Sequence, residues 1–287
     1  MVNMTSRRRF LQTGGLAATF GATLGARRLE AVGVELYTVR SVLPDKAAET
    51  FRALDAIGYR EAEMPFAGLD RIWSALAATR LKPVSIHLDS ALVTKGDDDT
   101  TRRTLDDLKR RGLSYAVYPY VPPAERGGLD FIRGLAEKFN RFGEKCQAAG
   151  LKFCYHNHAF EFEPMGGTTP FQVMIDHTDP KLVGFEVDVF WVSVGGHDPV
   201  EMLGKLKGRV PLVHLKDKEK GTPVVYKESV ARTAFKEIGN GVLDWPRIVR
   251  AAHAAGAEHY FVEQDQTPGD PVESLRQSFG YLSKLEF

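Results

Sequence analysis

One pattern repeats eight times from Ala31 onward: a short run rich in β-branched or aromatic residues ends in polar residues, and a stretch of helical periodicity follows. No linker rich in proline or serine separates these units. Eight strand-then-helix units in a chain of 287 residues predict a single (β/α)8 barrel. The predicted strands are Val32–Tyr37, Tyr59–Met64, Pro83–His87, Tyr115–Tyr118, Lys152–His156, Leu182–Asp188, Val210–Leu215 and Tyr260–Glu263.

Helical segments are predicted between these strands, and several of them end at a glycine, which favours the left-handed conformation of a helix stop. The alternative fold is a doubly wound open sheet. That fold requires a glycine-rich phosphate-binding turn after an early strand, and the sequence has none. The predicted helices are Lys46–Ile57, Arg71–Ala78, Thr101–Arg110, Leu129–Ala149, Val200–Leu206, Trp245–Ala255 and Pro271–Leu285, with stops at Gly58, Gly112, Gly150 and Gly256.

The first 26 residues have the pattern of an export signal rather than of a fold. Arg7, Arg8 and Arg9 precede Phe-Leu, and an uncharged run of small residues follows to Ala26. The Arg-Arg-x-Phe-Leu order resembles a twin-arginine signal peptide, which implies passage through the twin-arginine translocon and a periplasmic location. We therefore expect a signal over residues 1–26 and the barrel over 27–287. The alternative is a flexible basic terminus.

Charge and cysteine content exclude several classes of partner. The chain has 38 basic and 37 acidic residues, and removal of the three arginines leaves 35 against 37, a formal charge of −2. Such a near-neutral body predicts neither a nucleic-acid partner nor binding to an anionic membrane surface. Elsewhere no stretch approaches the roughly 18 apolar residues of a membrane span. Cys146 and Cys154 are too few for a disulfide framework or a thiolate metal site. Both are expected in the core, with a single bridge between them as the alternative. Homo-oligomerisation stays open.

Polar residues gather at the predicted strand ends, where a (β/α)8 barrel carries its active site. Four of the eight histidines, His87, His156, His158 and His214, lie there together with acids. Alternation along a strand predicts that Glu186 and Asp188 both face the barrel interior. We expect Glu186 to pair with Lys216, and Asp188, His214 and Glu263 to hold a divalent ion such as Mn, Co, Mg or Zn.

Five segments carry a specific resemblance. They are Phe-Cys-Tyr-His-Asn-His-Ala-Phe-Glu-Phe (153–162), Gly-Phe-Glu-Val-Asp-Val-Phe-Trp (184–191), Val-His-Leu-Lys-Asp (213–217), Gly-Asn-Gly-Val-Leu-Asp-Trp (239–245) and Val-Glu-Gln-Asp (262–265). In this order they resemble the xylose isomerase-like barrel superfamily, and within it the sugar phosphate isomerase/epimerase group. The resemblance covers nearly all of residues 31–287.

This resemblance implies one divalent ion held by Glu, Asp, His and Glu from successive late strands. Asp188, His214 and Glu263 match three of these positions. For the fourth, either Glu161 turns back to the metal, which we favour, or a histidine of the 156–158 run replaces the carboxylate. His156 and His158 are then bases or substrate contacts. Trp191 stands where ketose epimerases have a substrate-binding histidine.

The predicted activity is that of a metal-dependent isomerase or epimerase acting on a sugar or cyclitol. The metal would bind a carbonyl, and His156, His158 or Glu161 would remove the neighbouring proton through an enediolate. Lys216 is a further catalytic candidate, and the substrate-binding candidates are Glu63, His87, Tyr118 and Trp191. If the enolate instead expels a β-oxygen, the enzyme is a dehydratase or glycoside lyase.

Two other classes of protein fit this sequence less well. Endonuclease IV shares this fold and carries a further metal ligand three residues after the aspartate, where this chain has Trp191. A nuclease is also disfavoured by the near-neutral charge of the chain. A non-catalytic periplasmic sugar-binding protein would not need the acid-rich metal set.

Overall fold

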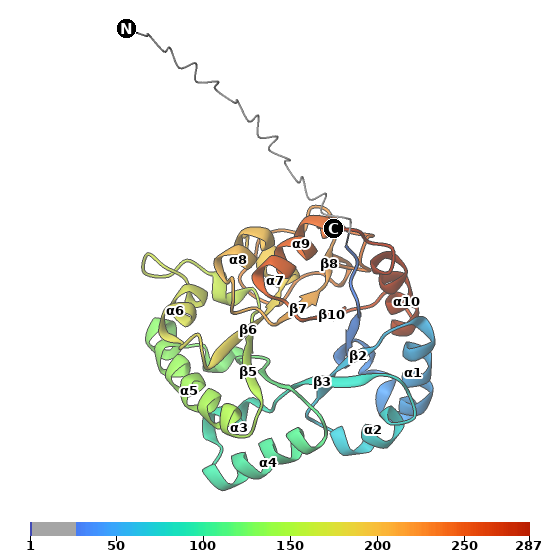
Figure 1. Cartoon of the computed structure of the whole chain (residues 1–287), viewed down its shortest axis with the longest axis horizontal. Coiled ribbons are helices and arrows are strands. Elements are labelled where there is room, and N and C mark those ends of the chain that lie inside the picture. The colour runs from blue at the N-terminus through green and yellow to red at the C-terminus, as the bar shows by residue number, and fades with distance from the viewer. Residues whose placement is uncertain (2–26) are drawn as a thin grey trace.

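The structure, a computed structural model, describes Met1 and residues 27–287 (Figure 1). Eight parallel strands pair into a closed barrel, because β1 pairs with β2 on one side and with β10 on the other. The predicted barrel is therefore confirmed. Its strands are β1 (Gly33–Glu35), β2 (Glu61–Pro65), β3 (Lys82–His87), β4 (Tyr115–Tyr118), β5 (Lys152–His156), β6 (Val183–Asp188), β7 (Leu212–Leu215) and β10 (His259–Val262).

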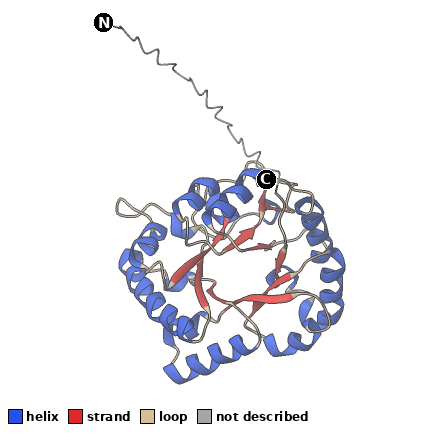
Figure 2. Ribbon diagram, in the orientation of Figure 1, coloured by secondary structure: helices blue, strands red, loops and turns tan. Residues whose placement is uncertain are grey.

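Helices surround this barrel as an outer ring (Figure 2). Every predicted helix is present, with ends that differ from the predicted ones by up to three residues. The helices are α1 (Leu43–Ile57), α2 (Leu69–Leu76), α3 (Ser90–Lys95), α4 (Asp98–Arg110), α5 (Gly128–Ala148), α6 (Pro170–His177), α7 (Val189–Val194), α8 (Pro199–Lys205), α9 (Trp245–Ala255) and α10 (Pro271–Leu282).

Local sequence signals account for several of these boundaries. The Asp244 side chain accepts a hydrogen bond from the backbone N–H of Arg247 and so caps the start of α9. Thr169 caps α6 in the same way, through the backbone N–H of Gln172. Gly256 ends α9 with φ at +101°, in the left-handed region that favours glycine.

The barrel interior is a small apolar core beneath the polar strand ends. Alternate residues of each strand face inward, and Val117, Cys154, Leu212 and Phe261 pack there as one buried cluster. Gly33 leaves room for the Phe261 ring, because a Cβ at residue 33 would lie 2.4 Å from it. Cys154 and Cys146 are both buried and free, as expected of core cysteines.

The predicted elements did not include the short helices α3, α6 and α7, nor an antiparallel pair, β8 (Asp217–Lys218) with β9 (Phe235–Lys236). Helix α7 begins directly after β6 because the Asp188 carboxylate accepts the backbone N–H of Trp191 and caps the helix. The last residue of β6 is therefore also a helix cap, which fixes its side chain at the barrel mouth. Short 3₁₀ turns lie at Leu36–Val39, Pro123–Glu125, Phe160–Phe162 and Arg232–Ala234.

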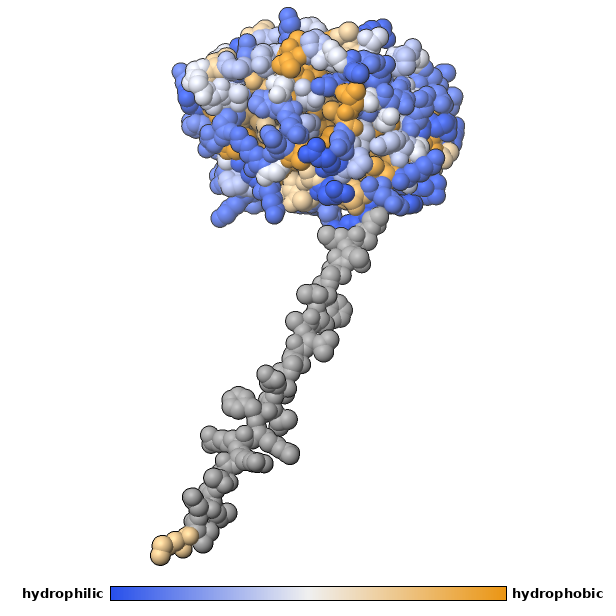
Figure 3. Space-filling view, turned by 90° about the horizontal axis from the view of Figure 1, so that it is seen from above, coloured by the Kyte–Doolittle hydropathy of each residue, from blue (hydrophilic) through white to orange (hydrophobic). Residues whose placement is uncertain are grey.

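The outer surface is mainly hydrophilic on the face drawn in Figure 3, with hydrophobic patches between the polar side chains. The chain closes on itself where two backbone hydrogen bonds join Arg27 and Phe287. Within the described residues, none of the helices combines the length and apolar character needed to cross a membrane. The predicted signal peptide at residues 1–26 lies outside the residues that the structure describes, Met1 apart.

Candidate active site

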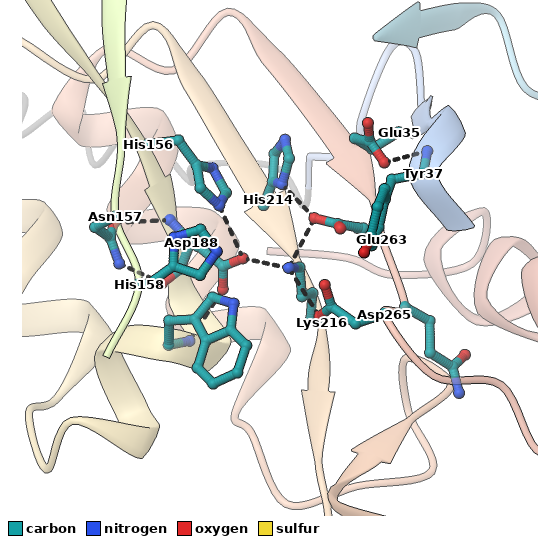
Figure 4. Close-up of polar contacts among 12 residues, drawn as sticks. Glu35, Tyr37, His156, Asn157, His158, Asp188, His214, Lys216, Glu263 and Asp265 are labelled. Carbon is teal, nitrogen blue, oxygen red and sulfur yellow. Dashed lines mark hydrogen bonds and ion pairs between the residues drawn. The ribbon is translucent and has the colours of Figure 1, made fainter. Parts of the chain in front are cut away.

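Four side chains from adjacent strands converge at the C-terminal mouth of the barrel. His156 ends β5, Asp188 ends β6, His214 lies in β7, and Glu263 directly follows β10. One nitrogen or oxygen atom of each lies within 4.8 Å of those of the other three, and all four residues are buried. Figure 4 shows these side chains pointing toward one another around Lys216. The grouping includes the three predicted ligands and, as the fourth member, His156.

The two histidines of this group are held in orientation by carboxylates one layer deeper in the barrel. His156 Nδ1 lies 3.0 Å from Glu186 Oε2, and His214 Nε2 lies 2.6 Å from Glu63 Oε2. Their other nitrogens face the group, with His156 Nε2 3.7 Å from Asp188 Oδ2 and His214 Nδ1 2.8 Å from Glu263 Oε2. Metal-binding histidines are typically oriented by a carboxylate on the second ring nitrogen.

The donor set fits a divalent ion. It consists of two imidazoles and two carboxylates, a mixture that suits zinc, cobalt or manganese, and it contains no thiolate. Six acidic side chains surround this end of the barrel, so a buried cation also offsets their mutual repulsion. The acids are Glu35, Glu63, Glu186, Asp188, Glu263 and Asp265.

The predicted ion pair between Glu186 and Lys216 is wrong. Lys216 Nζ lies 2.7 Å from Glu263 Oε2, 2.8 Å from Asp188 Oδ2 and 3.0 Å from Asp265 Oδ2. The register explains the difference: Glu186 lies opposite Leu212 and Asp188 opposite His214, so Lys216 lies one layer above Asp188 and two layers above Glu186. Lys216 thus contacts the two carboxylates that would also bind the ion.

Glu161, the favoured fourth ligand, lies outside the group. Its carboxylate accepts hydrogen bonds from the Tyr155 hydroxyl and from the backbone N–H of His158, the latter at 3.0 Å. These contacts hold the turn that carries His158, and Glu161 is not part of the candidate ligand group. The His158 ring lies 5.0 Å from that of His156, and its buried Nδ1 has no hydrogen-bond partner among the described residues.

Tyr118 does not reach the mouth, so its prediction as a substrate contact is wrong. Val117 faces the barrel interior, and alternation therefore turns Tyr118 outward, where its ring packs 4.8 Å from that of Phe139 on α5. Tyr120, two residues further along, lies 5.0 Å from the His158 ring instead. The ring of Trp191, the other aromatic candidate, lies 5.5 Å from the His158 ring.

The remaining candidates, Glu63 and His87, belong to the deeper layer. His87 Nε2 lies 2.9 Å from Glu186 and 3.1 Å from Glu63, and the His87 side chain is 17% exposed. Glu35 also belongs to this layer but was not predicted from the sequence. The first strand was predicted to end at Tyr37, whereas it ends at Glu35. The position of Glu35, two residues after the inward-facing Gly33, is the signal that identifies it.

Burial and charge set the protonation states at the site. Burial, reinforced by His214, lowers the pKa of His156, and burial together with Lys216 lowers the pKa of His158. The imidazoles of His156 and His158 are therefore neutral near pH 7, and the neutral form is the one that binds a metal or accepts a proton. Burial opposes the charge on Lys216, but Asp188 and Asp265 outweigh it and raise the pKa of Lys216. Burial raises the pKa of Glu161 to about 8.

Comparison with known proteins identifies relatives of this chain. A family model described as xylose isomerase-like TIM barrel matches residues 31–285. An inosose dehydratase from Geobacillus thermodenitrificans is 29% identical over 162 residues, which cover 52% of this chain and 52% of that protein. The chain thus spans about half the length of this curated relative.

Solved structures agree on the fold. A sugar phosphate isomerase/epimerase from Parabacteroides distasonis superposes with a TM-score of 0.73 at 23% identity, covering 89% of this chain and 98% of that one. The IOLI protein, described with a binding zinc atom, has a TM-score of 0.68 at 12% identity and covers 90% of this chain and 99% of its own. At these identities the likeness shows the fold alone.

Proposed function

The chain belongs to the xylose isomerase-like TIM barrel family, and on this basis we propose that it is a divalent-metal-dependent isomerase or epimerase of a keto-sugar or cyclitol. The observation that carries the proposal is the buried group of His156, Asp188, His214 and Glu263 at the barrel mouth. Its reaction begins with removal of a proton from the carbon next to a carbonyl.

His156, Asp188, His214 and Glu263 would hold the ion. When bound, a divalent ion supplies Lewis acidity, which polarises a carbonyl oxygen and acidifies the neighbouring C–H bond. The zinc of the IOLI protein supports zinc beside manganese, cobalt and magnesium as the ion. The deeper carboxylates keep the two histidine ligands oriented: Glu186 holds His156, and Glu63 holds His214.

His158 is the proposed base. Its ring lies beside His156, one of the four candidate metal ligands. Its Nδ1 has no protein partner among the described residues, and its backbone N–H donates to Glu161. A base near the reacting carbon must be neutral to take the proton, and the lowered pKa of His158 meets that requirement. Lys216 places a positive charge where the substrate oxygen becomes negative.

Dehydration is the second candidate outcome, favoured by the inosose dehydratase relative. Dehydration and isomerisation share the enolate, and they differ in where the proton goes next. Return of the proton to carbon gives an isomer or epimer, whereas protonation of a β-hydroxyl expels water. The same site residues serve the first step of both reactions.

Proton NMR in deuterium oxide tests the proposal. The metal-loaded protein is incubated with 2-keto-inositol, a 3-keto-glucoside and ketohexoses, and we expect loss of the α-proton signal of one of them. His158→Ala should abolish this exchange while the metal stays bound. The control is His177→Ala, at the exposed C-terminal end of α6. No exchange with any of these compounds would overturn the enolate chemistry and favour a sugar-binding protein. New isomer signals favour the isomerase, and an alkene signal the dehydratase.

The proposal includes export. The twin-arginine pattern at residues 7–11 supports passage through the twin-arginine translocon to the periplasm. A periplasmic location favours an unphosphorylated substrate, since phosphorylated sugars are mostly cytoplasmic.

A further inference from the structure

Trp191 carries a buried polar atom that the fold leaves unpaired. Its indole Nε1 has no hydrogen-bond partner among the described residues, although the residue is only 2% exposed. An indole N–H is a donor only, and a buried donor without an acceptor destabilises the folded state. The chain offers a contrast in Trp245, whose Nε1 donates to Asp217 at 2.8 Å. Trp245 thus has a structural acceptor, whereas Trp191 has none in the part of the chain that the structure describes.

The Trp191 ring is fixed rather than free to search for an acceptor. Its backbone N–H donates to Asp188 Oδ1 at 3.0 Å, so the residue is anchored to a candidate metal ligand. Its ring packs edge-on against Phe190, with the centroids 4.9 Å apart, and lies 5.9 Å from the Phe235 ring. The other neighbours of the ring are functional: the His158 ring at 5.5 Å and Lys216 Nζ at 5.7 Å. The ring that carries the unpaired donor therefore borders the candidate active site.

The surroundings limit the kind of acceptor that this donor can serve. Phosphates are usually bound by cationic side chains or by several N–H groups together. Trp191 offers one uncharged N–H, and the neighbouring Lys216 is already bound to three carboxylates. A hydroxyl or carbonyl oxygen of an uncharged polyol suits such a donor better than a phosphate does.

We propose that Trp191 is a specificity-determining residue. Its indole N–H donates a hydrogen bond to an oxygen of an unphosphorylated polyol that is bound beside the candidate metal ligands His156, Asp188, His214 and Glu263. This inference rests on the proposed function for the location of the substrate. The oxygen that accepts from Trp191 is a different one from the substrate oxygen that the metal ion would bind. Trp191 therefore acts through its nitrogen and not only as an apolar wall.

Nitrogen-15 NMR of the zinc-loaded protein tests this directly. The sequence has three tryptophans, Trp73, Trp191 and Trp245, and the signal missing from Trp191→Phe assigns the indole of interest. Addition of myo-inositol or D-glucose should move the Trp191 signal downfield and saturably, and leave the other two in place. If neither polyol moves it, or if myo-inositol 1-phosphate moves it more than myo-inositol does, the proposal is overturned.

Affinity provides the second readout. Trp191→Phe keeps a ring for packing and removes the N–H, so the affinity for the polyol should fall by about 3- to 10-fold, the range of one hydrogen bond. Metal content should stay at the wild-type level. Trp73→Phe, on the outer helix α2, is the matched control and should change neither quantity. An unchanged affinity, or loss of the metal, would contradict the role of the nitrogen in polyol binding.

The two proposals fail in different ways. If the indole signal moves but no ketose exchanges its α-proton, the polyol subsite stands and the enolate chemistry is wrong. If exchange proceeds and Trp191→Phe binds and reacts like the wild type, the chemistry stands and the subsite is wrong.

Discussion

Asp217 offers a sharp test of how the loop beside the active site is held. Its buried carboxylate accepts five N–H groups. Oδ2 accepts those of Gly239, Gly241 and the Trp245 indole at 2.9, 3.1 and 2.8 Å, and Oδ1 accepts those of Lys218 and Leu243 at 2.8 and 3.2 Å. One side chain thus connects β8 to the loop that leads into α9.

Asp217→Asn removes one acceptor oxygen at almost constant volume. Whichever way the amide turns, its NH₂ group faces at least two buried donors, each of which costs about 1–3 kcal/mol when unpaired. We expect a loss of about 3 kcal/mol in the free energy of unfolding, and about 4–5 kcal/mol for Asp217→Ala.

Urea unfolding measures both losses through the midpoint, provided that the m-value stays constant. The control is Asp244→Ala, which removes an exposed helix cap with a single acceptor contact and should cost about 1 kcal/mol. If Asp217→Asn cost no more than this control, the five-donor account of the loop would be refuted.

Three further predictions follow from the site and from the terminus. Burial raises the pKa of Glu161 to about 8, so the folded state keeps a proton that the unfolded chain releases near pH 4.3. The free energy of unfolding should therefore fall between pH 5 and 8, by up to about 1.4 kcal/mol per pH unit. Glu161→Gln should remove this pH dependence in urea titrations. A pH-independent difference between the two proteins would contradict it. Lys216→Met leaves three carboxylates without their ammonium partner, so the free energy of unfolding of the metal-free protein should fall by about 3–5 kcal/mol. Zinc should raise the melting temperature of this variant more than that of the wild type. An equal rise in both proteins would contradict the idea that Lys216 and the ion share these carboxylates. Replacement of Arg7, Arg8 and Arg9 by lysine should leave the protein in the cytoplasm on fractionation, and normal periplasmic recovery would refute the twin-arginine assignment.

The barrel was predictable from sequence because each strand and helix carries its own local signal. The strands Tyr115–Tyr118 and Lys152–His156 and the helix Trp245–Ala255 have the predicted boundaries, since their apolar runs are bounded by turns or caps. Helix α7 was missed because Val-Phe-Trp-Val has no helical periodicity of its own. Its start depends on the side chain of Asp188, a contact that strand prediction does not consider.

The site was less predictable, because it depends on strand register and side-chain direction. Tyr118 was assigned to the mouth by its position at a strand end, although alternation turns it outward. Lys216 was paired with Glu186 by proximity in the sequence pattern, whereas the register of β6 and β7 places it against Asp188. The resemblance left the fourth ligand open between a carboxylate and a histidine. The hydrogen bonds of Glu161 to Tyr155 and His158 keep it outside the group, and His156 lies within it.

Metal analysis of four purified proteins tests the central claim most directly. The wild type, His156→Ala, Glu161→Ala and the control His177→Ala are each dialysed against excess zinc and then against buffer, and the bound metal is measured by mass spectrometry. The group of His156, Asp188, His214 and Glu263 predicts about one ion per chain in the wild type, in Glu161→Ala and in the control, and loss of the ion from His156→Ala, because each member is one of about four ligands. Full occupancy in His156→Ala together with loss from Glu161→Ala would contradict the site.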